Sequence, residues 1–415
     1  MNSRERVLKV LNHEIPDRVP VDLGSTRTSG ISAIAYNKLI SELGLKKRLP
    51  NMYDVVQQLV YPDHQIRKIF DIDIIDAGQA FIGSRAAWKE FELKDKSRCL
   101  VPDRINFTKK DDGSMDVVYK DGTVLGKMPE SSLYIDQIFW VYGSLEKIPD
   151  VLSEEDFAKE LWAYTTPSPG HINIFDDDQA KLFSDCIEKL YKETDYAIML
   201  RFGGNLVESG FGLRGMENYL CDLYMDAKGV NRFLDVLMEG YLSSVSKILE
   251  LAGKHINILM FADDMGSERA AFFSPDIYRK YFKNRHREMW ELIHSKSKCK
   301  IFLHSCGSIY ELIPDLIDAG LDILNPIQTT AVNMEPDKLK KEFGKDLVFW
   351  GGCCDTREVL VKGSPQDVKA DVKKRVKILG QNGGLIFNQI HNILADVPPQ
   401  NIKALFEAAR LYGQY

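Results

Sequence analysis

The segment HSCG places His304 and Cys306 two residues apart, directly after the apolar run KIFL. In an extended strand this spacing points both side chains to the same side. Imidazole nitrogens and cysteine thiolates are common zinc ligands in proteins. The pair alone is a weak signal, because a buried histidine beside a buried cysteine also satisfies ordinary packing. Two interpretations therefore stand at this point, a metal site and a packed pair in the core.

Two further segments with metal-ligating side chains follow similar runs. Cys353 and Cys354 come after LVFW and two glycines, and His391 comes shortly after LIFN. If these runs are strands of one barrel, their ends face one mouth. Three nitrogen or sulfur ligands with an open position are typical of catalytic zinc. We predict His304, Cys306 and Cys354 as zinc ligands and Cys353 as a small filler. His391 is either a ligand or a group that hydrogen-bonds a bound molecule.

Carboxylate and amide side chains end other apolar runs. Asp263 and Asp264 follow ILMFA. Paired carboxylates beside a metal can ligate it, transfer a proton or orient a substrate. We predict both as catalytic, and the alternative for one of them is an N-cap on the following turn. Residues in comparable places are predicted to bind a cofactor, namely Asn325, Gln328, Asn388 and His391.

Eight short apolar or β-branched runs must position these side chains, and each is followed by a stretch with helical periodicity. This alternation is typical of parallel strands covered by helices, and eight such units form a (β/α)8 TIM barrel. Ser274 followed by Pro275 is one helix start that fits the pattern. We predict a single barrel over residues 1–415. Its strands are Val19 to Leu23, Ile72 to Asp76, Ala197 to Phe202, Ile258 to Ala262, Lys300 to His304, Ile323 to Asn325, Leu347 to Gly351 and Gly384 to Asn388.

The stretch from Arg85 to Thr166 departs from this alternation. Two alternating runs flank Asp121-Gly122, which predicts a β-hairpin. The chain has 415 residues, whereas a typical barrel has about 250. We therefore predict a β-rich insertion over residues 85–166, between the second and third strands.

The composition argues against several classes of protein. The chain has 54 Lys and Arg against 60 Asp and Glu, a net charge of −6 with no basic run, so a nucleic-acid partner is not expected. A bilayer-spanning helix needs about 20 consecutive apolar residues, and charged residues interrupt every apolar stretch before that length. The N-terminal segment has no signal-peptide pattern. Seven cysteines, an odd number, favour free thiols or metal ligands. We expect a cytoplasmic protein without a membrane partner.

At these residues the chain resembles the uroporphyrinogen decarboxylase superfamily. The similarity covers nearly the whole length apart from the predicted insertion. The true decarboxylase carries an arginine-rich segment after its first strand, where this chain reads DLGSTRTSG with Arg27 as its one basic residue. The stretches that carry the resemblance include RERVLKVLNHEIPDRVPVDLG, FADDMG, HSCGSIYELIPDLIDAGLDILNPIQ, WGGCCDTREVL and FNQIHNILADVPPQNIKALFEAA.

The methyltransferase branch of this superfamily is marked by His-x-Cys and a later cysteine, which His304, Cys306 and Cys354 match. The resemblance implies a zinc-dependent enzyme that moves a methyl group from a small methylated donor to the cob(I)alamin of a corrinoid-binding protein. Methyl ethers, in O-demethylation, are the donors it suggests most. The alternatives are a decarboxylase of the uroporphyrinogen type, a methylcobalamin-to-thiol or methylcobalamin-to-pterin methyltransferase, and a non-catalytic binding protein. A homodimer is also left open.

Overall fold

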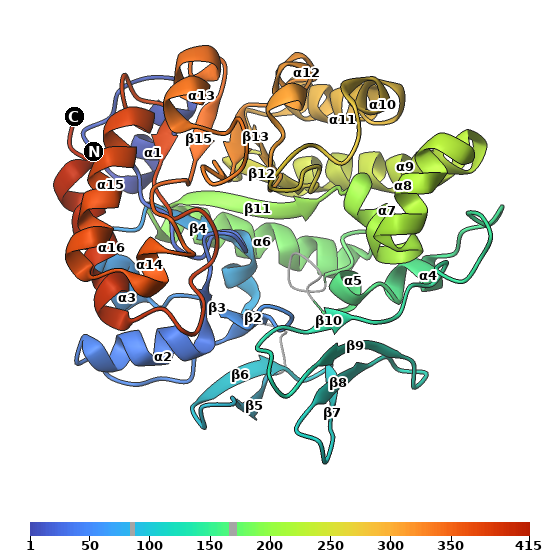
Figure 1. Cartoon of the computed structure of the whole chain (residues 1–415), viewed down its shortest axis with the longest axis horizontal. Coiled ribbons are helices and arrows are strands. Elements are labelled where there is room, and N and C mark those ends of the chain that lie inside the picture. The colour runs from blue at the N-terminus through green and yellow to red at the C-terminus, as the bar shows by residue number, and fades with distance from the viewer. Residues whose placement is uncertain (84–87, 166–171) are drawn as a thin grey trace.

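The computed structural model describes residues 1–83, 88–165 and 172–415. Its centre is a sheet of seven parallel strands in the order β16-β15-β14-β13-β12-β11-β4, and Figure 1 shows β11 running across the middle of the molecule. These strands correspond to the second to eighth predicted runs. They are β4 (Ile74–Asp76), β11 (Ala197–Gly203), β12 (Ile258–Ala262), β13 (Lys300–His304), β14 (Ile323–Asn325), β15 (Val348–Trp350) and β16 (Leu385–Ile386).

The first predicted strand, by contrast, joins the two edges of this sheet without becoming a regular strand. Val21 makes parallel bridges both to Ile72, before β4, and to Phe387, after β16. The pairing stays short because Pro20 has no N–H and because the N–H of Val21 donates to the Asp73 carboxylate at 2.8 Å. The result is a curled parallel sheet whose two edges meet at Val21, as in a TIM-barrel-like fold.

Helices cover the outer side of the sheet and one end of it. Helix α1 (Ser3–Leu11) begins at the capping box of Asn2 and Glu5 and packs Val7, Val10 and Leu11 against the apolar side chains inside the curled sheet. Within the described ranges, no helix is both long and apolar enough to cross a membrane. The longer outer helices are α6 (Asp177–Glu193), α9 (Ala227–Ala252), α11 (Lys283–Lys296), α15 (Pro365–Leu379) and α16 (Pro399–Tyr412).

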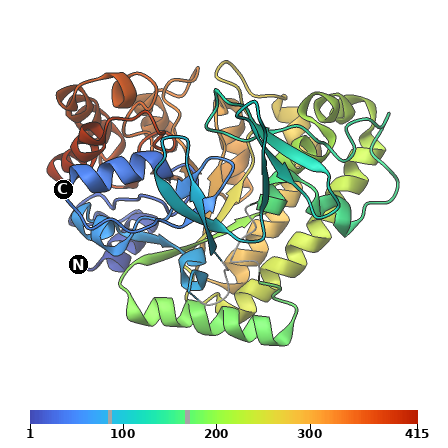
Figure 2. The ribbon, with the colours of Figure 1, turned by 90° about the horizontal axis from the view of Figure 1, so that it is seen from below.

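Additional β-structure lies between β4 and β11 in the chain, and Figure 2 shows it in front of the curled sheet. Strands β8 (Met115–Val118) and β9 (Val124–Met128) pair antiparallel about the turn at Asp121-Gly122. Both ends of the predicted insertion, at residues 85 and 166, lie outside the described residues. The other strands here are β5 (Trp88–Glu92), β6 (Arg98–Pro102), β7 (Asn106–Lys109) and β10 (Asp136–Gln137).

A small antiparallel sheet precedes this segment, in the order β1-β3-β2. Its strands are β1 (Ile31–Ser32), β2 (Met52–Asp54) and β3 (Leu59–Val60). The loop of residues 22–30, between the bridge at Val21 and β1, is almost wholly buried, with Ser25, Thr26, Thr28 and Ser29 each at most 2% exposed. This loop therefore belongs to the interior of the fold.

Asp73 holds the joint between the first and second strand positions. Its fully buried carboxylate pairs with Arg6 at 2.8 Å and Arg18 at 2.7 Å. Removing the charge of Asp73 would leave the positive charges of Arg6 and Arg18 without this buried counter-charge. We expect Asp73→Asn to lower the free energy of unfolding by about 3–5 kcal/mol, measured by urea denaturation. The control is Asp71→Asn, whose side chain is 44% exposed and should change stability by less than about 0.5 kcal/mol. Equal midpoints for the two variants would contradict this role.

Asp22 should make stability depend on pH. Burial raises the pKa of its carboxyl to about 6, although the Ser29, Ser25 and Trp350 side chains lower it. The ordinary value, about 3.9, applies to the unfolded chain, so between these two pH values the folded state holds more protons. The contribution of Asp22 to stability therefore falls as pH rises through that window, by on the order of 3 kcal/mol, and is constant above it. Asp22→Asn should remove this term, so its unfolding free energy relative to wild type should rise between pH 4 and 7. Parallel curves for the two proteins would exclude the effect.

Candidate metal centre

The curled sheet arranges its side chains in layers, and the last layer is polar. Apolar residues fill the inside, among them Ile74, Met199, Met260, Phe302, Ile323 and Ile386. Because side chains alternate along a strand, the residue two positions further on points into the same space. Those residues are Asp76, Arg201, Ala262, His304, Asn325 and Asn388. Except at Ala262, the strand ends therefore present polar groups to one mouth.

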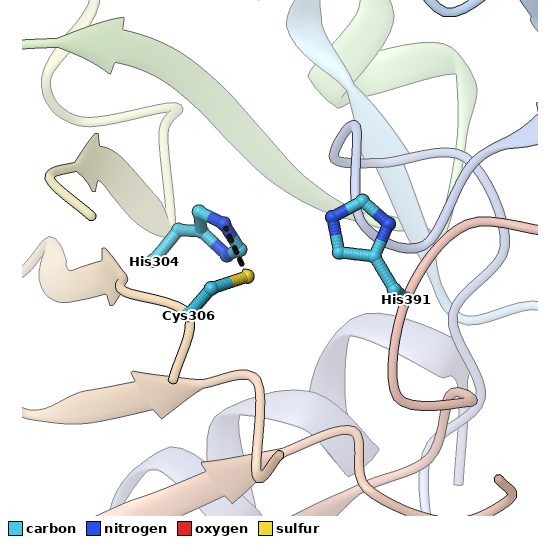
Figure 3. Close-up of side chains that lie close together, drawn as sticks. All are labelled: His304, Cys306 and His391. Atoms are coloured by element: carbon cyan, nitrogen blue, oxygen red, sulfur yellow. Dashed lines mark hydrogen bonds between the residues drawn. The ribbon is translucent and has the colours of Figure 1, made fainter. Parts of the chain in front are cut away.

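Three ligand atoms meet in this layer, from His304, Cys306 and His391, all within 4.8 Å of one another. Figure 3 shows the three side chains directed toward a common space, His304 and Cys306 from the end of β13 and His391 from the loop after β16. Cys306 Sγ lies 3.4 Å from His304 Nε2. Sulfur and nitrogen ligands of one tetrahedral zinc ion are about 3.5 Å apart. The donor set and its spacing therefore fit zinc.

A hydrogen bond to Asn325 orients the His304 ring. His304 Nδ1 lies 2.8 Å from Asn325 Oδ1, and Asn325 Nδ2 donates to the carbonyl of Trp350 at 2.9 Å. Metal-binding histidines usually donate their second ring N–H to such an acceptor. Asn325, predicted to contact a cofactor, is fully buried and orients a candidate ligand instead.

His391 has a comparable arrangement. Its Nδ1 lies 3.1 Å from Asn392 Oδ1, which also accepts from the hydroxyl of Tyr134 at 3.3 Å. Burial and the neighbouring His304 lower the pKa of His391. A neutral imidazole is the form that binds metal. Sequence reasoning left His391 as a ligand or a hydrogen-bonding group, and its position agrees with a ligand.

Cys354, predicted as the third ligand, is not in this group. The fully buried Cys354 has its Sγ 3.7 Å from the carbonyl of Asp355, and burial raises the pKa of this thiol well above its ordinary value. The reason lies in the preceding glycines, Gly351 and Gly352, whose φ angles are 89° and 79°. These left-handed residues turn the chain out of the strand, so alternation no longer decides where Cys354 points. Cys353 is also fully buried, as predicted for a filler.

The two predicted catalytic carboxylates have different surroundings. Asp263 is fully buried and accepts the N–H groups of Leu206, Val207 and Glu208 at 2.8–2.9 Å. It therefore anchors the N-terminus of helix α7 (Val207–Arg214). This helix precedes Asp263 in the chain, whereas the N-cap considered from the sequence was on the turn that follows. Asp264 lies beside the candidate ligands, because its Oδ1 accepts the N–H of Cys306 at 2.7 Å and lies 3.4 Å from His304 Nε2, with 37% of the side chain exposed.

Gln328 and Asn388, the remaining predicted cofactor contacts, lie in the same layer or next to it. Gln328 Oε1 accepts the N–H of Gly307 at 2.8 Å and so holds the loop after Cys306. Asn388 is fully buried, and neither of its side-chain amide atoms has a hydrogen-bond partner among the described residues. Binding of a cofactor by Asn388 stays a prediction.

Sequence reasoning missed two charged groups of the mouth. Arg201, on β11, forms an ion pair with Asp76, donates to the Tyr61 hydroxyl at 3.2 Å and lies 4.7 Å from the centre of the Tyr53 ring. Glu208 accepts from the Asn205 amide at 2.7 Å. Burial, followed by the charges of Asp264 and Asp263, raises the pKa of Glu208 well above its ordinary value. The position of Arg201 near the end of a predicted strand could have identified it. No sequence pattern marked Glu208.

Comparison with known proteins places these features in a family. A family model described as uroporphyrinogen decarboxylase (URO-D) matches residues 205–412. The uroporphyrinogen decarboxylase of Pelodictyon phaeoclathratiforme is 27% identical over 144 residues, which are 33% of this chain and 38% of that protein. The methionine synthase of Methanocaldococcus jannaschii is 25% identical over 173 residues, 42% of this chain and 50% of that protein. Each match spans less than two thirds of the relative.

A solved structure matches over almost the full length. A methyltransferase from Methanosarcina mazei superposes with a TM-score of 0.57 over 99% of both chains, at 16% sequence identity. At that identity the likeness establishes the fold alone. Since the family model covers just over half of its length, the chain belongs to the uroporphyrinogen decarboxylase (URO-D) family.

Proposed function

We propose that this chain is a zinc-dependent methyltransferase that moves a methyl group from a small methylated donor to the cob(I)alamin of a separate corrinoid-binding protein. A methyl ether is the donor we favour. The observation that carries the proposal is the convergence of His304, Cys306 and His391 within 4.8 Å. The likeness in fold to a methyltransferase over 99% of both chains supports it.

A methyl ether resists nucleophiles because the oxygen that leaves carries a developing negative charge. A zinc ion held by His304, Cys306 and His391 would supply a Lewis acid for that charge. The neutral rings of the two histidines and the single thiolate would leave such a centre with a net positive charge. We propose His391 as the third ligand in place of Cys354, because its ring lies with the other two ligand atoms.

Asp264 is suited to move the proton. In the proposed reaction the bond between the methyl carbon and oxygen would break, the corrinoid of the partner protein would take the methyl group, and the oxygen would take up a proton. Asp264 is partly exposed and 3.4 Å from His304 Nε2, so its carboxyl can deliver that proton at the ligands. Its Oδ1 also accepts the Cys306 N–H, which fixes the carboxyl beside them.

A methyltransferase acting on a thiol is the second candidate. The relative named methionine synthase favours it, and the same three side chains could hold a zinc-bound thiolate. A decarboxylase without a metal is less well supported, because it would use cationic groups to bind acidic substrates. Arg201 is paired with Asp76, and Arg27 is paired with Asp54 at 2.9 Å.

Metal content tests the ligand set. Purified wild-type protein should carry stoichiometric zinc, whereas Cys306→Ser and His391→Ala should lose most of it, because each removes one of three protein ligands. Elemental analysis after exhaustive dialysis measures this. Zinc affinity should also fall at low pH, because the thiol must lose its proton to bind.

Cys353→Ser and Cys354→Ser are the matched controls, since both change a buried cysteine outside the group of three. Both should retain zinc. Loss of zinc from Cys354→Ser with retention in His391→Ala would restore Cys354 as the third ligand, and full zinc in Cys306→Ser would exclude the site.

Replacing each of the two neighbouring aspartates by asparagine in turn should separate an effect on catalysis from an effect on folding. Asp264→Asn keeps an oxygen that can accept the Cys306 N–H but loses the proton, so turnover should fall about a hundredfold with little change in melting temperature. Asp263→Asn should instead lower the melting temperature, because a charged acceptor of three N–H groups is lost. The assay is methyl transfer from candidate ethers to cob(I)alamin. Normal turnover in Asp264→Asn would exclude its proton role.

A further inference from the structure

The buried loop of residues 22–30 reaches the metal centre through one hydroxyl group. Thr28 Oγ1 donates to Asn325 Oδ1 at 2.8 Å, and both residues are at most 2% exposed. Asn325 in turn contacts His304. We propose that Thr28 is a positioning residue which, through Asn325, fixes the tautomer and orientation of the His304 ring. The inference rests on the proposed metal centre and adds to it a residue from outside the barrel strands.

The direction of each hydrogen bond follows from the chemistry of the amide. Asn325 Nδ2 donates to the Trp350 carbonyl, so Oδ1 is the atom that faces Thr28 and His304. A carbonyl oxygen only accepts and has two lone pairs. One lone pair takes the hydroxyl proton of Thr28, and the other takes a proton from His304 Nδ1. In a neutral ring the proton is then on Nδ1, and Nε2 carries the lone pair.

That tautomer is the one the candidate centre needs. His304 Nε2 is the atom 3.4 Å from Cys306 Sγ, so its lone pair points toward the other ligand atoms. The opposite tautomer would place a proton there and exclude a metal. If Asn325 turned its amide over, Nδ2 would face His304 Nδ1 and favour that wrong tautomer. The Trp350 carbonyl opposes this turn, because it can only accept and would then face Oδ1. The Thr28 hydroxyl adds to the same preference while it donates to Oδ1.

The loop itself orients the Thr28 hydroxyl. Thr28 Oγ1 also lies 2.9 Å from Thr26 Oγ1, and the Thr26 hydroxyl donates to Ser29 Oγ at 3.1 Å. Ser29 Oγ accepts from the N–H of Thr26 at 3.1 Å, and the N–H of Ser29 donates to Thr26 Oγ1 at 3.0 Å. Hydroxyl side chains of the buried loop thus support the Thr28 hydroxyl.

The test compares Thr28→Val with Thr28→Ser in the full chain. Valine has nearly the shape of threonine without the hydroxyl, whereas serine retains the hydroxyl. Ser25→Ala is the control for the loop, because Ser25 is equally buried and its hydroxyl contacts Met199 Sδ at 3.8 Å and not Asn325. Melting temperatures establish that each variant folds, and Thr28→Ala replaces Thr28→Val if the latter does not.

Two quantities are measured. The first is the tautomer of His304 in metal-free protein with 15N-labelled histidine, at a pH of about 8.5, above the ordinary histidine pKa, with His304→Gln to assign the signal. The second is the zinc dissociation constant, by competition with a chelator. Loss of a group that orients a metal ligand typically weakens binding 10–100-fold.

We expect wild type, Thr28→Ser and Ser25→Ala to show the Nδ1–H tautomer and similar zinc affinity. Thr28→Val should show a mixture of tautomers and bind zinc at least about tenfold more weakly. A pure Nδ1–H tautomer in Thr28→Val, or an equal loss of affinity in Ser25→Ala, would overturn the proposal. If the wild-type protein binds no zinc, the proposed methyl transfer fails. The tautomer measurement in metal-free protein still tests the role of Thr28.

Discussion

The meeting of the two sheet edges at Val21 is the constraint on which the rest of this structure depends. Parallel strands in a closed arrangement send their carboxyl ends to one mouth, and alternation then gives each strand one inward side chain in the last layer. His304 from β13 and His391 from the loop after β16 come together because those strands occupy fixed places in the sheet order. The bridges of Val21 to both edges close the curl in which these strand ends face one mouth.

Burial of polar groups in this layer is costly, and several of the buried groups have a specific partner. Asp263 receives three backbone N–H groups of α7, and Arg201 pairs with Asp76. The side chain of Asn325 forms a hydrogen bond with His304, and that of Asn392 forms one with His391. Asp264, by contrast with Asp263, has 37% of its side chain exposed. The contrast explains why two neighbouring aspartates can serve different ends, one the fold and the other the proposed proton transfer.

Sequence patterns predicted the strands and the in-phase residues at their ends, because hydrophobic periodicity sets both. His304 and Cys306 were found in this way, since Cys306 continues the alternation of β13 by one step. Alternation could not predict the third member of the candidate group, because Gly351 and Gly352 turn the chain before Cys354 and because His391 lies on a loop. Thr28 was missed for the same reason, since its place depends on a buried loop. The first strand was predicted but is limited to bridges, because Pro20 and the Asp73 carboxylate remove ladder hydrogen bonds.

X-ray absorption at the zinc edge of the loaded protein tests the central claim, that His304, Cys306 and His391 form the proposed metal centre. Zinc–sulfur bonds are about 2.3 Å and zinc–nitrogen bonds about 2.0–2.1 Å, so the two are resolved. We expect one sulfur in the first shell, with nitrogen or oxygen in the other positions and the outer-shell scattering of two imidazole rings. Two sulfurs would place a second cysteine in the site, and a shell of oxygen alone would show that these residues do not bind the metal.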